Sequence, residues 1–117
     1  MTPRARVMAL AAVTAAATAL AACSASRMER SDGMSASAVP PEEQADYALF
    51  AQRCSKCHSL ARPLDSGITD DDFWRMYVEK MRRQPGSGIT VEDTVPILHF
   101  LHWYSQEQLA RKARGGG

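Results

Sequence analysis

Apolar side chains recur with the spacing of an α-helix in three parts of the chain, at residues 41–53, about 69–83 and from about 90 to 108. No part shows the two-residue alternation that marks a β-strand, and the sequence contains no internal repeat. The pattern therefore predicts an all-α fold in which three helices form one small domain, as 117 residues allow.

The first predicted helix begins at Pro41, a residue that suits the opening position because its fixed φ is already helical. Acidic residues at positions 42, 43 and 46 complement the positive end of the helix dipole. Leu49 and Phe50 supply a modest apolar stripe. The helix is expected to run to Arg53 and directly into the cysteines that follow.

The second predicted helix starts with Thr69 as the N-cap, and three aspartates that favour the N-terminal dipole follow it. Pro85 and Gly86 end this helix after about Arg83. Its apolar residues share one face. They are Phe73, Trp74, Tyr77, Val78 and Met81.

The third predicted helix has two possible starts. Residues 90–93, Thr-Val-Glu-Asp, have the form of an N-terminal cap, but Pro96 removes a backbone hydrogen bond if the helix begins there. A start at Thr94 accommodates Pro96 more easily, and the sequence does not decide between the two. The helix is expected to end near Gln108, and residues 109–117 are predicted to form a disordered basic tail.

Residues 1–22 have the form of an export signal. Arg4 and Arg6 precede an apolar run at residues 7–20, which is shorter than the roughly 20 residues that cross a bilayer. Removing this segment takes away two of the 14 basic residues and none of the 13 acidic ones, so the net charge changes from +1 to −1. Such a balance gives no basic field for nucleic acid, and no nucleic-acid partner is expected.

Residues 20–23, Leu-Ala-Ala-Cys, resemble the lipobox of bacterial lipoproteins. The resemblance implies that Cys23 is lipidated and becomes the new N-terminus. The alternative is ordinary cleavage after small residues, which leaves Cys23 as a free thiol. Residues 23–41 are rich in Ser, Ala and charge and lack aromatic residues, so they are predicted to form a flexible linker.

Residues 54–58 read Cys-Ser-Lys-Cys-His, which is the attachment pattern of a c-type haem. In a helical turn, residues three apart lie on one side, so Cys54 and Cys57 can each bond one vinyl group of the same porphyrin. His58 is then placed to coordinate the iron. A zinc site would need a second ligand pair, and a dithiol oxidoreductase normally carries its motif in a βαβ unit; the sequence has neither. One covalent haem c is the expected cofactor.

The second axial ligand has four candidates, which are Met76, Met81, His99 and His102. We favour Met81, because it lies at the end of its helix just before a flexible Pro-Gly turn, where its side chain can reach the iron. Met76 is expected to fill space in the core, as most helical methionines do, and the two histidines to lie on a half-exposed face. A haem without a second ligand is the remaining alternative.

Residues 42–108 resemble a small monohaem class I cytochrome c domain. The resemblance is carried by an aromatic residue one turn before the C-x-x-C-H motif, a proline after it, a tryptophan in the middle helix with a methionine near the end of that helix, and an aromatic-leucine pair in the closing helix. It implies a three-helix domain wrapped around a covalent haem, with Cys54, Cys57, His58 and Met81 as the cofactor-binding residues and His58 and Met81 as the iron ligands.

The resemblance also implies two contacts. The carbonyl of Pro63 would accept a hydrogen bond from His58, and Phe50 would meet Phe100 or Leu101 where the first and last helices cross. Six apolar residues are expected to form the wall around the porphyrin. They are Leu60, Leu64, Trp74, Val78, Leu98 and Leu101.

These features predict an electron carrier of the bacterial cell envelope, lipid-anchored on the periplasmic side, that meets a redox protein transiently and has no small-molecule substrate or enzyme activity of its own. Two alternatives are a haem subunit of a periplasmic dehydrogenase and a ligand-binding or peroxidatic haem with an open site. Six basic residues are predicted to form a positive rim near the haem edge that steers an acidic partner. They are Arg53, Lys56, Arg62, Lys80, Arg82 and Arg83.

Overall fold

The computed structural model describes residues 32–115, and every regular element in this part of the chain is helical. The signal segment, Cys23 and the first part of the expected linker lie outside the described residues. Because all the described elements are helical, the predicted all-α fold class is confirmed. None of the described helices combines the length and the hydrophobicity that a membrane span requires. In chain order the elements are η1 (Ala36–Ala38), η2 (Pro41–Glu43), α2 (Gln44–Cys54), α3 (Ala61–Leu64), α4 (Asp71–Arg82) and α5 (Thr94–Ala113).

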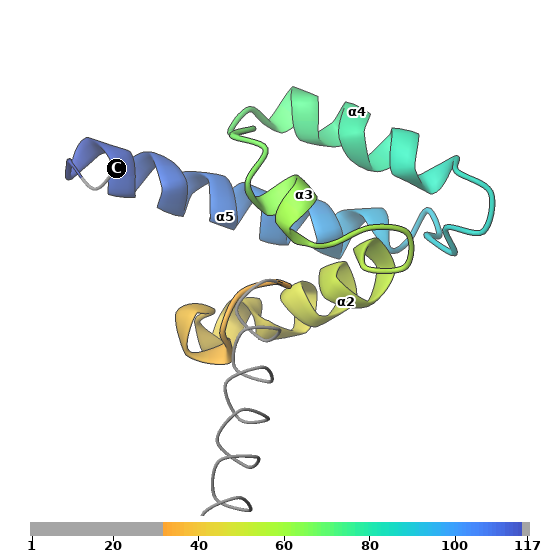
Figure 1. Ribbon diagram of the computed structural model, residues 1–117, viewed down its shortest axis with the longest axis horizontal. Coiled ribbons are helices and arrows are strands. Elements are labelled where there is room, and N and C mark those ends of the chain that lie inside the picture. The colour runs from red at the N-terminus through yellow and green to blue at the C-terminus, as the bar shows by residue number, and fades with distance from the viewer. Residues whose placement is uncertain (1–31, 116–117) are drawn as a thin grey trace, which may run out of the picture. The chain divides into compact units, whose positions relative to one another are not determined.

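The long helix α5 is the element on which the others pack, with α2 on one side of it and α4 on the other (Figure 1). The rings of Phe50 in α2 and Phe100 in α5 lie 4.9 Å apart between centroids, which confirms the predicted crossing contact between the first and last helices. Both rings are fully buried. Burial of a large apolar side chain of this kind is worth about 1.5–3 kcal/mol, so this contact contributes strongly to holding α2 on α5.

The segment before α2 differs from the predicted flexible linker. The hydroxyl group of Tyr47 accepts a hydrogen bond from the backbone N–H of Met34 at 2.7 Å and donates one to the Met34 carbonyl at 3.1 Å. Val39 is only 2% exposed, and the side chain of Gln44 donates to its carbonyl. This segment is therefore attached to α2 through Met34 and Val39, while residues 35–38 are exposed, because Tyr47 and Gln44 supply polar partners that a linker composition does not reveal.

Helix α4 begins one residue later than predicted. Its N-cap is Asp70, whose Oδ1 accepts hydrogen bonds from the N–H groups of Asp72 and Phe73 at 2.9 and 3.0 Å, so the prediction of Thr69 as the cap is wrong. Trp74 and Val78 are buried as expected, whereas Phe73 is 59% exposed. At 100° per residue Phe73 lies about 120° from the midpoint between Trp74 and Val78, and a helix that packs on one neighbour buries only a narrow stripe.

Helix α5 resolves the choice between two starts. Thr90 and Asp93 exchange hydrogen bonds, with the Thr90 N–H donating to the Asp93 carboxylate and the Asp93 N–H donating to the Thr90 hydroxyl group. The α-helix itself begins at Thr94, so Pro96 falls in its first turn, where a missing N–H costs little. The helix continues to Ala113, beyond the predicted end at Gln108, because residues 106–113 are nearly all strong helix formers.

Candidate haem-binding site

One largely apolar pocket contains all four residues that the sequence assigns to the haem: Cys54, Cys57, His58 and Met81. Its lining comes from three segments, which are the end of α2 with the turn after it, the second half of α4, and the turn that follows α4. The other residues that line it are Arg53, Tyr77, Gln84, Ser87 and Ile89. The fold therefore brings Met81 next to a motif from which it is separated by more than 20 residues of sequence.

The two thiols differ in exposure. Cys54 is the last residue of α2 and is partly buried, whereas Cys57 lies in the following turn and is exposed. Burial raises the pKa of the Cys54 thiol to about 11. A reactive dithiol typically lies at a helix N-terminus, where the dipole stabilises a thiolate, but Cys54 lies at a C-terminus. The position of Cys54 therefore argues against a dithiol oxidoreductase and keeps its thiol protonated at neutral pH.

The ring of His58 is partly buried, and its Nδ1 lies 3.0 Å from the carbonyl oxygen of Ser59. With the proton on Nδ1, this nitrogen donates to Ser59 and leaves Nε2 free to coordinate a metal. The family resemblance implies that His58 donates a hydrogen bond to the Pro63 carbonyl. Among the described residues His58 makes no such bond. The Pro63 carbonyl instead accepts from the backbone N–H of Ser66.

Tyr77 carries an unsatisfied polar group at the pocket. Its hydroxyl oxygen is buried and has no hydrogen-bond partner among the described residues. Burial, and secondly the nearby Cys54 thiol, raise the pKa of Tyr77. The ring itself is fixed by an edge-to-face contact with Trp74, with centroids 5.6 Å apart. An unpaired buried hydroxyl group is costly, and here it lines a space that a ligand can enter.

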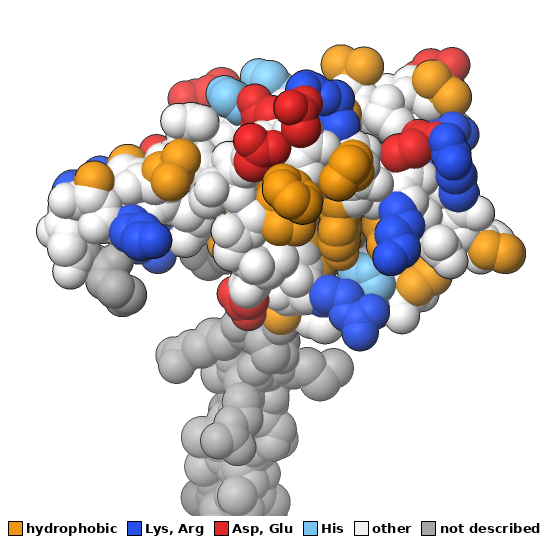
Figure 2. Space-filling model, turned by 90° about the horizontal axis from the view of Figure 1, so that it is seen from above, with side chains coloured by type: hydrophobic (Ala, Val, Ile, Leu, Met, Phe, Trp, Pro, Cys, Tyr) orange, Lys and Arg blue, Asp and Glu red, His pale blue; other side chains and the backbone are white. Residues whose placement is uncertain are grey.

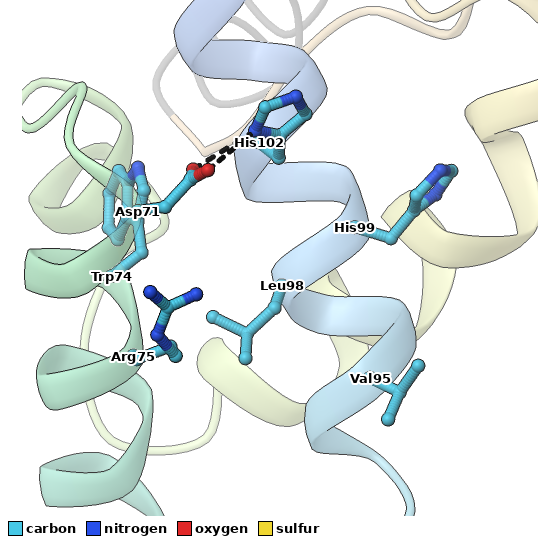
Figure 3. A pocket seen from close by; sticks show the side chains of 7 residues that line it. All are labelled: Asp71, Trp74, Arg75, Val95, Leu98, His99 and His102. Atoms are coloured by element: carbon cyan, nitrogen blue, oxygen red, sulfur yellow. Dashed lines mark hydrogen bonds and ion pairs between the residues drawn. The ribbon is translucent and has the colours of Figure 1, made fainter.

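Among the four candidates for the second iron ligand, Met81 alone lines this pocket. Met76 is 62% exposed, so the expectation that it fills space in the core is wrong. His99 and His102 line a different groove, between α4 and α5 (Figure 3). There the Nδ1 of His102 lies 3.0 Å from both carboxylate oxygens of Asp71.

The predicted porphyrin wall and the pocket lining are different sets of residues. The six apolar residues of the predicted wall belong to or pack against the hydrophobic core, and none lines the pocket. Sequence reasoning missed Gln84, Ser87 and Ile89, which lie in an irregular turn with no periodic pattern to identify them. The pocket holds about 40 Å³, below the roughly 300 Å³ of the smallest ligand pockets, so entry of a porphyrin requires its walls to separate.

The predicted positive rim is partly neutralised. Arg82 and Arg83 both pair with Glu79, at 2.7 and 2.8 Å, and hydrogen bonds from Arg82 and then Arg83 lower the pKa of Glu79 to about 2. Arg53 pairs with Asp93 at 2.8 Å. In the face shown in Figure 2, Lys and Arg side chains lie around one side of a group of hydrophobic side chains, and Asp and Glu side chains gather on another. Of the six residues of the predicted rim, Lys56, Arg62 and Lys80 form no salt bridge within residues 32–115.

Comparison of the chain with protein-family models, with curated proteins and with solved structures finds no significant match in any of the three. The site is therefore interpreted from its own residues.

Proposed function

We propose that the chain is a monohaem c-type cytochrome that transfers electrons. The observation that supports the proposal most strongly is the shared pocket of the C-x-x-C-H motif and Met81. The motif alone suggests haem attachment, and a thioether beside it would supply a second iron ligand of the kind that cytochromes c use.

Each residue has a defined role in this proposal. Cys54 and Cys57 would hold the porphyrin through thioethers, and the iron would be bound by Nε2 of His58 and the sulfur of Met81. When bound, the haem supplies an iron centre that alternates between Fe(II) and Fe(III). The carbonyl of Ser59 orients the imidazole. The unpaired hydroxyl group of Tyr77 is available to donate a hydrogen bond to a polar group of the cofactor.

The second ligand also bears on the alternative of an open, ligand-binding haem. If Met81 binds the iron, it would compete with gases and peroxide, so its place in the pocket lining favours electron transfer over ligand chemistry. No described residue specifically favours a fixed dehydrogenase complex. The proposed redox partner is a protein with an acidic surface, attracted by Lys56, Arg62 and Lys80. The cytochrome c-like domain is proposed to be anchored on the periplasmic side of a bacterial membrane through lipidated Cys23.

The first test is the absorption spectrum of the purified full chain, together with Met81→Ala and its matched control Met76→Ala. We expect one haem that stays attached on a denaturing gel, and a weak red charge-transfer band in the oxidised protein of the kind that Met-ligated c-type cytochromes show. Met81→Ala removes this band, allows rapid carbon monoxide binding to the reduced protein and lowers the reduction potential, because a thioether ligand favours Fe(II).

Met76→Ala leaves the band and the potential unchanged, and it alters stability by no more than about 0.5 kcal/mol, because Met76 is exposed. A purified chain without covalent haem contradicts the whole proposal. A native protein that binds carbon monoxide quickly contradicts Met81 ligation and favours the open-site alternative.

A further inference from the structure

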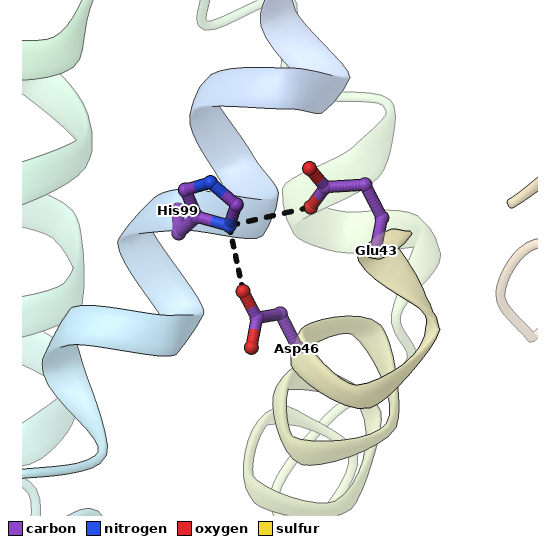
Figure 4. A group of neighbouring side chains, drawn as sticks. All are labelled: Glu43, Asp46 and His99. Atoms are coloured by element: carbon purple, nitrogen blue, oxygen red, sulfur yellow. Dashed lines mark hydrogen bonds and ion pairs between the residues drawn. The ribbon is translucent and has the colours of Figure 1, made fainter. Parts of the chain in front are cut away.

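Three potential metal ligands from two distant parts of the sequence meet where α2 and α5 cross (Figure 4). His99 extends from α5 toward two carboxylates, those of Glu43 at the end of η2 and Asp46 in the first turn of α2. The Nδ1 of His99 lies 2.6 Å from Asp46 Oδ2 and 3.5 Å from Glu43 Oε2. The three ligand atoms all lie within 4.8 Å of one another.

Glu43 is the residue that a simple ion pair does not explain. Its side chain is only 8% exposed, and its Oε2 is buried and makes no hydrogen bond with any described residue. This oxygen is directed toward His99 and Asp46 (Figure 4). Burying a carboxylate oxygen without a donor is costly, because the oxygen loses its hydration, and the imidazole of His99, 3.5 Å away, gives it no hydrogen bond. A cation at the centre of the cluster would supply the missing partner.

We propose that Glu43, Asp46 and His99 bind one divalent transition-metal ion of the zinc class, through Oε2, Oδ2 and Nδ1. One imidazole nitrogen and two carboxylate oxygens form a donor set that zinc accepts, with further positions filled by water. Two ligand atoms about 2.1 Å from a tetrahedral zinc ion lie roughly 3.4 Å apart, close to the 3.5 Å between His99 and Glu43.

The 2.6 Å contact between His99 and Asp46 is a hydrogen bond, and it must lengthen by less than about 1 Å when the metal replaces the shared proton. Both side chains have room for that movement, since His99 is 61% and Asp46 is 26% exposed.

The ion would join the start of α2 to α5. Asp46 lies eight residues before Cys54, about 12 Å along the axis of α2, so the metal site and the haem pocket occupy different ends of this helix. Two carboxylates brought together at the end of η2 and the start of α2 repel each other, and a divalent ion would convert that repulsion into a link between α2 and α5. The proposal does not depend on haem attachment.

His102 provides a matched control within the same helix. It pairs with one carboxylate, that of Asp71, and within the described part of the chain no second carboxylate completes a three-ligand group around it. Both histidines are more than half exposed, so replacing either by glutamine preserves the core. The comparison of His99→Gln with His102→Gln therefore separates a metal site from a general affinity of surface histidines for zinc.

The experiment uses the full chain as isolated, without an affinity tag and after treatment with a chelator. Zinc chloride is titrated in a calorimeter, and thermal unfolding is followed by circular dichroism. We expect one zinc ion per chain and a midpoint raised by about 10 °C or more at a 100-fold excess over Kd.

His99→Gln and Asp46→Asn each weaken zinc binding by more than about tenfold and remove the thermal shift, whereas His102→Gln changes neither. The proposal is overturned if the wild-type chain takes up no zinc, if His99→Gln binds zinc like the wild type, or if magnesium chloride stabilises the chain as much as zinc does. Failure of these tests leaves the haem spectrum unaffected, so it is distinguishable from failure of the proposed cytochrome function.

Discussion

The indole N–H of Trp74 shows how one buried polar group can connect two helices. Trp74 is 1% exposed, and its Nε1 donates a hydrogen bond of 2.7 Å to the hydroxyl oxygen of Ser105, which is itself fully buried. Ser105 in turn donates to the carbonyl of Leu101, four residues earlier in α5. Both donors in this pair of hydrogen bonds are satisfied. The core between α4 and α5 therefore contains a polar link in which no donor is buried without an acceptor.

Replacing Ser105 by alanine tests that link. We expect the free energy of unfolding to fall by about 1–3 kcal/mol, because the Trp74 N–H is left buried without an acceptor. Urea denaturation followed by circular dichroism measures the change. In a Trp74→Phe background the same substitution costs clearly less, because both partners are then absent. Equal costs in the two backgrounds would show that the hydrogen bond contributes nothing.

At the scale of the elements, the start of α4 depends on a side chain that the sequence pattern did not select. Thr69 and Asp70 are both acceptable N-caps, and a cap signature alone does not decide which residue leaves the helical conformation. In the structure Asp70 has extended backbone dihedral angles and accepts both N–H groups.

Asp70→Ala is therefore expected to destabilise the protein by about 0.5–2 kcal/mol, because the N–H groups of Asp72 and Phe73 lose their acceptor. Thr69, the N-cap that the sequence predicted, provides the matched control. Thr69→Ala is expected to change the free energy of unfolding by less than about 0.5 kcal/mol. Urea denaturation of the two variants distinguishes them. A larger loss for Thr69→Ala would contradict the observed cap.

The turn before α5 makes the stability of the protein depend on pH in the acidic range. Hydrogen bonding from the Thr90 backbone, and then the ion pair with Arg53, lowers the pKa of Asp93 below its usual value of 3.8. A carboxyl group whose pKa is lower in the folded state stabilises the fold above the unfolded pKa. That contribution is lost as the pH falls through the lower, folded pKa.

Asp93→Asn is expected to lower the urea midpoint at pH 6, and this deficit is expected to shrink as the pH is lowered below 3.8, because the wild-type carboxyl group then progressively loses its charge. Asparagine retains an acceptor for the Thr90 N–H, so the variant isolates the effect of the charge. Glu92→Gln is the control, since Glu92 is exposed and forms no salt bridge within residues 32–115. A deficit that stays constant as the pH is lowered through this range would show that the charge of Asp93 is not responsible.

At the scale of the whole molecule, the proposed electron carrier has its redox site and its membrane anchor in different parts of the chain. The anchor rests on the lipobox resemblance at Cys23, and the redox site rests on the pocket that includes Cys54 and Met81. The two proposals are therefore separable by mutation.

Cys23→Ser is expected to move the protein from the membrane fraction to the soluble fraction without changing its absorption spectrum, because serine cannot receive a thioether-linked lipid. Immunoblotting of fractionated cells measures the distribution. Mass spectrometry of the native protein provides the second readout. An unmodified N-terminus at another residue would contradict lipid anchoring.

The sequence by itself determined the features that depend on neighbouring residues. Helical periodicity identified the three long helices within residues 32–115, the reciprocal cap of Thr90 and Asp93 was recognisable from its spacing, and residues 54–58 carry their chemical pattern in five consecutive positions. These features depend on contacts within one or two turns, which local sequence encodes directly.

Only the tertiary structure decided which distant residues meet. The sequence favoured Met81 over Met76, His99 and His102 only from its place at the end of a helix, and the packing of α2 and α4 on α5 placed Met81 alone among them at the pocket. The same packing brought His99 to Glu43 and Asp46, more than 50 residues earlier in the chain. Periodicity defines the faces of a helix, but the crossing of two helices defines which side chains touch, and that crossing is set by the packing of large buried side chains such as Phe50 and Phe100.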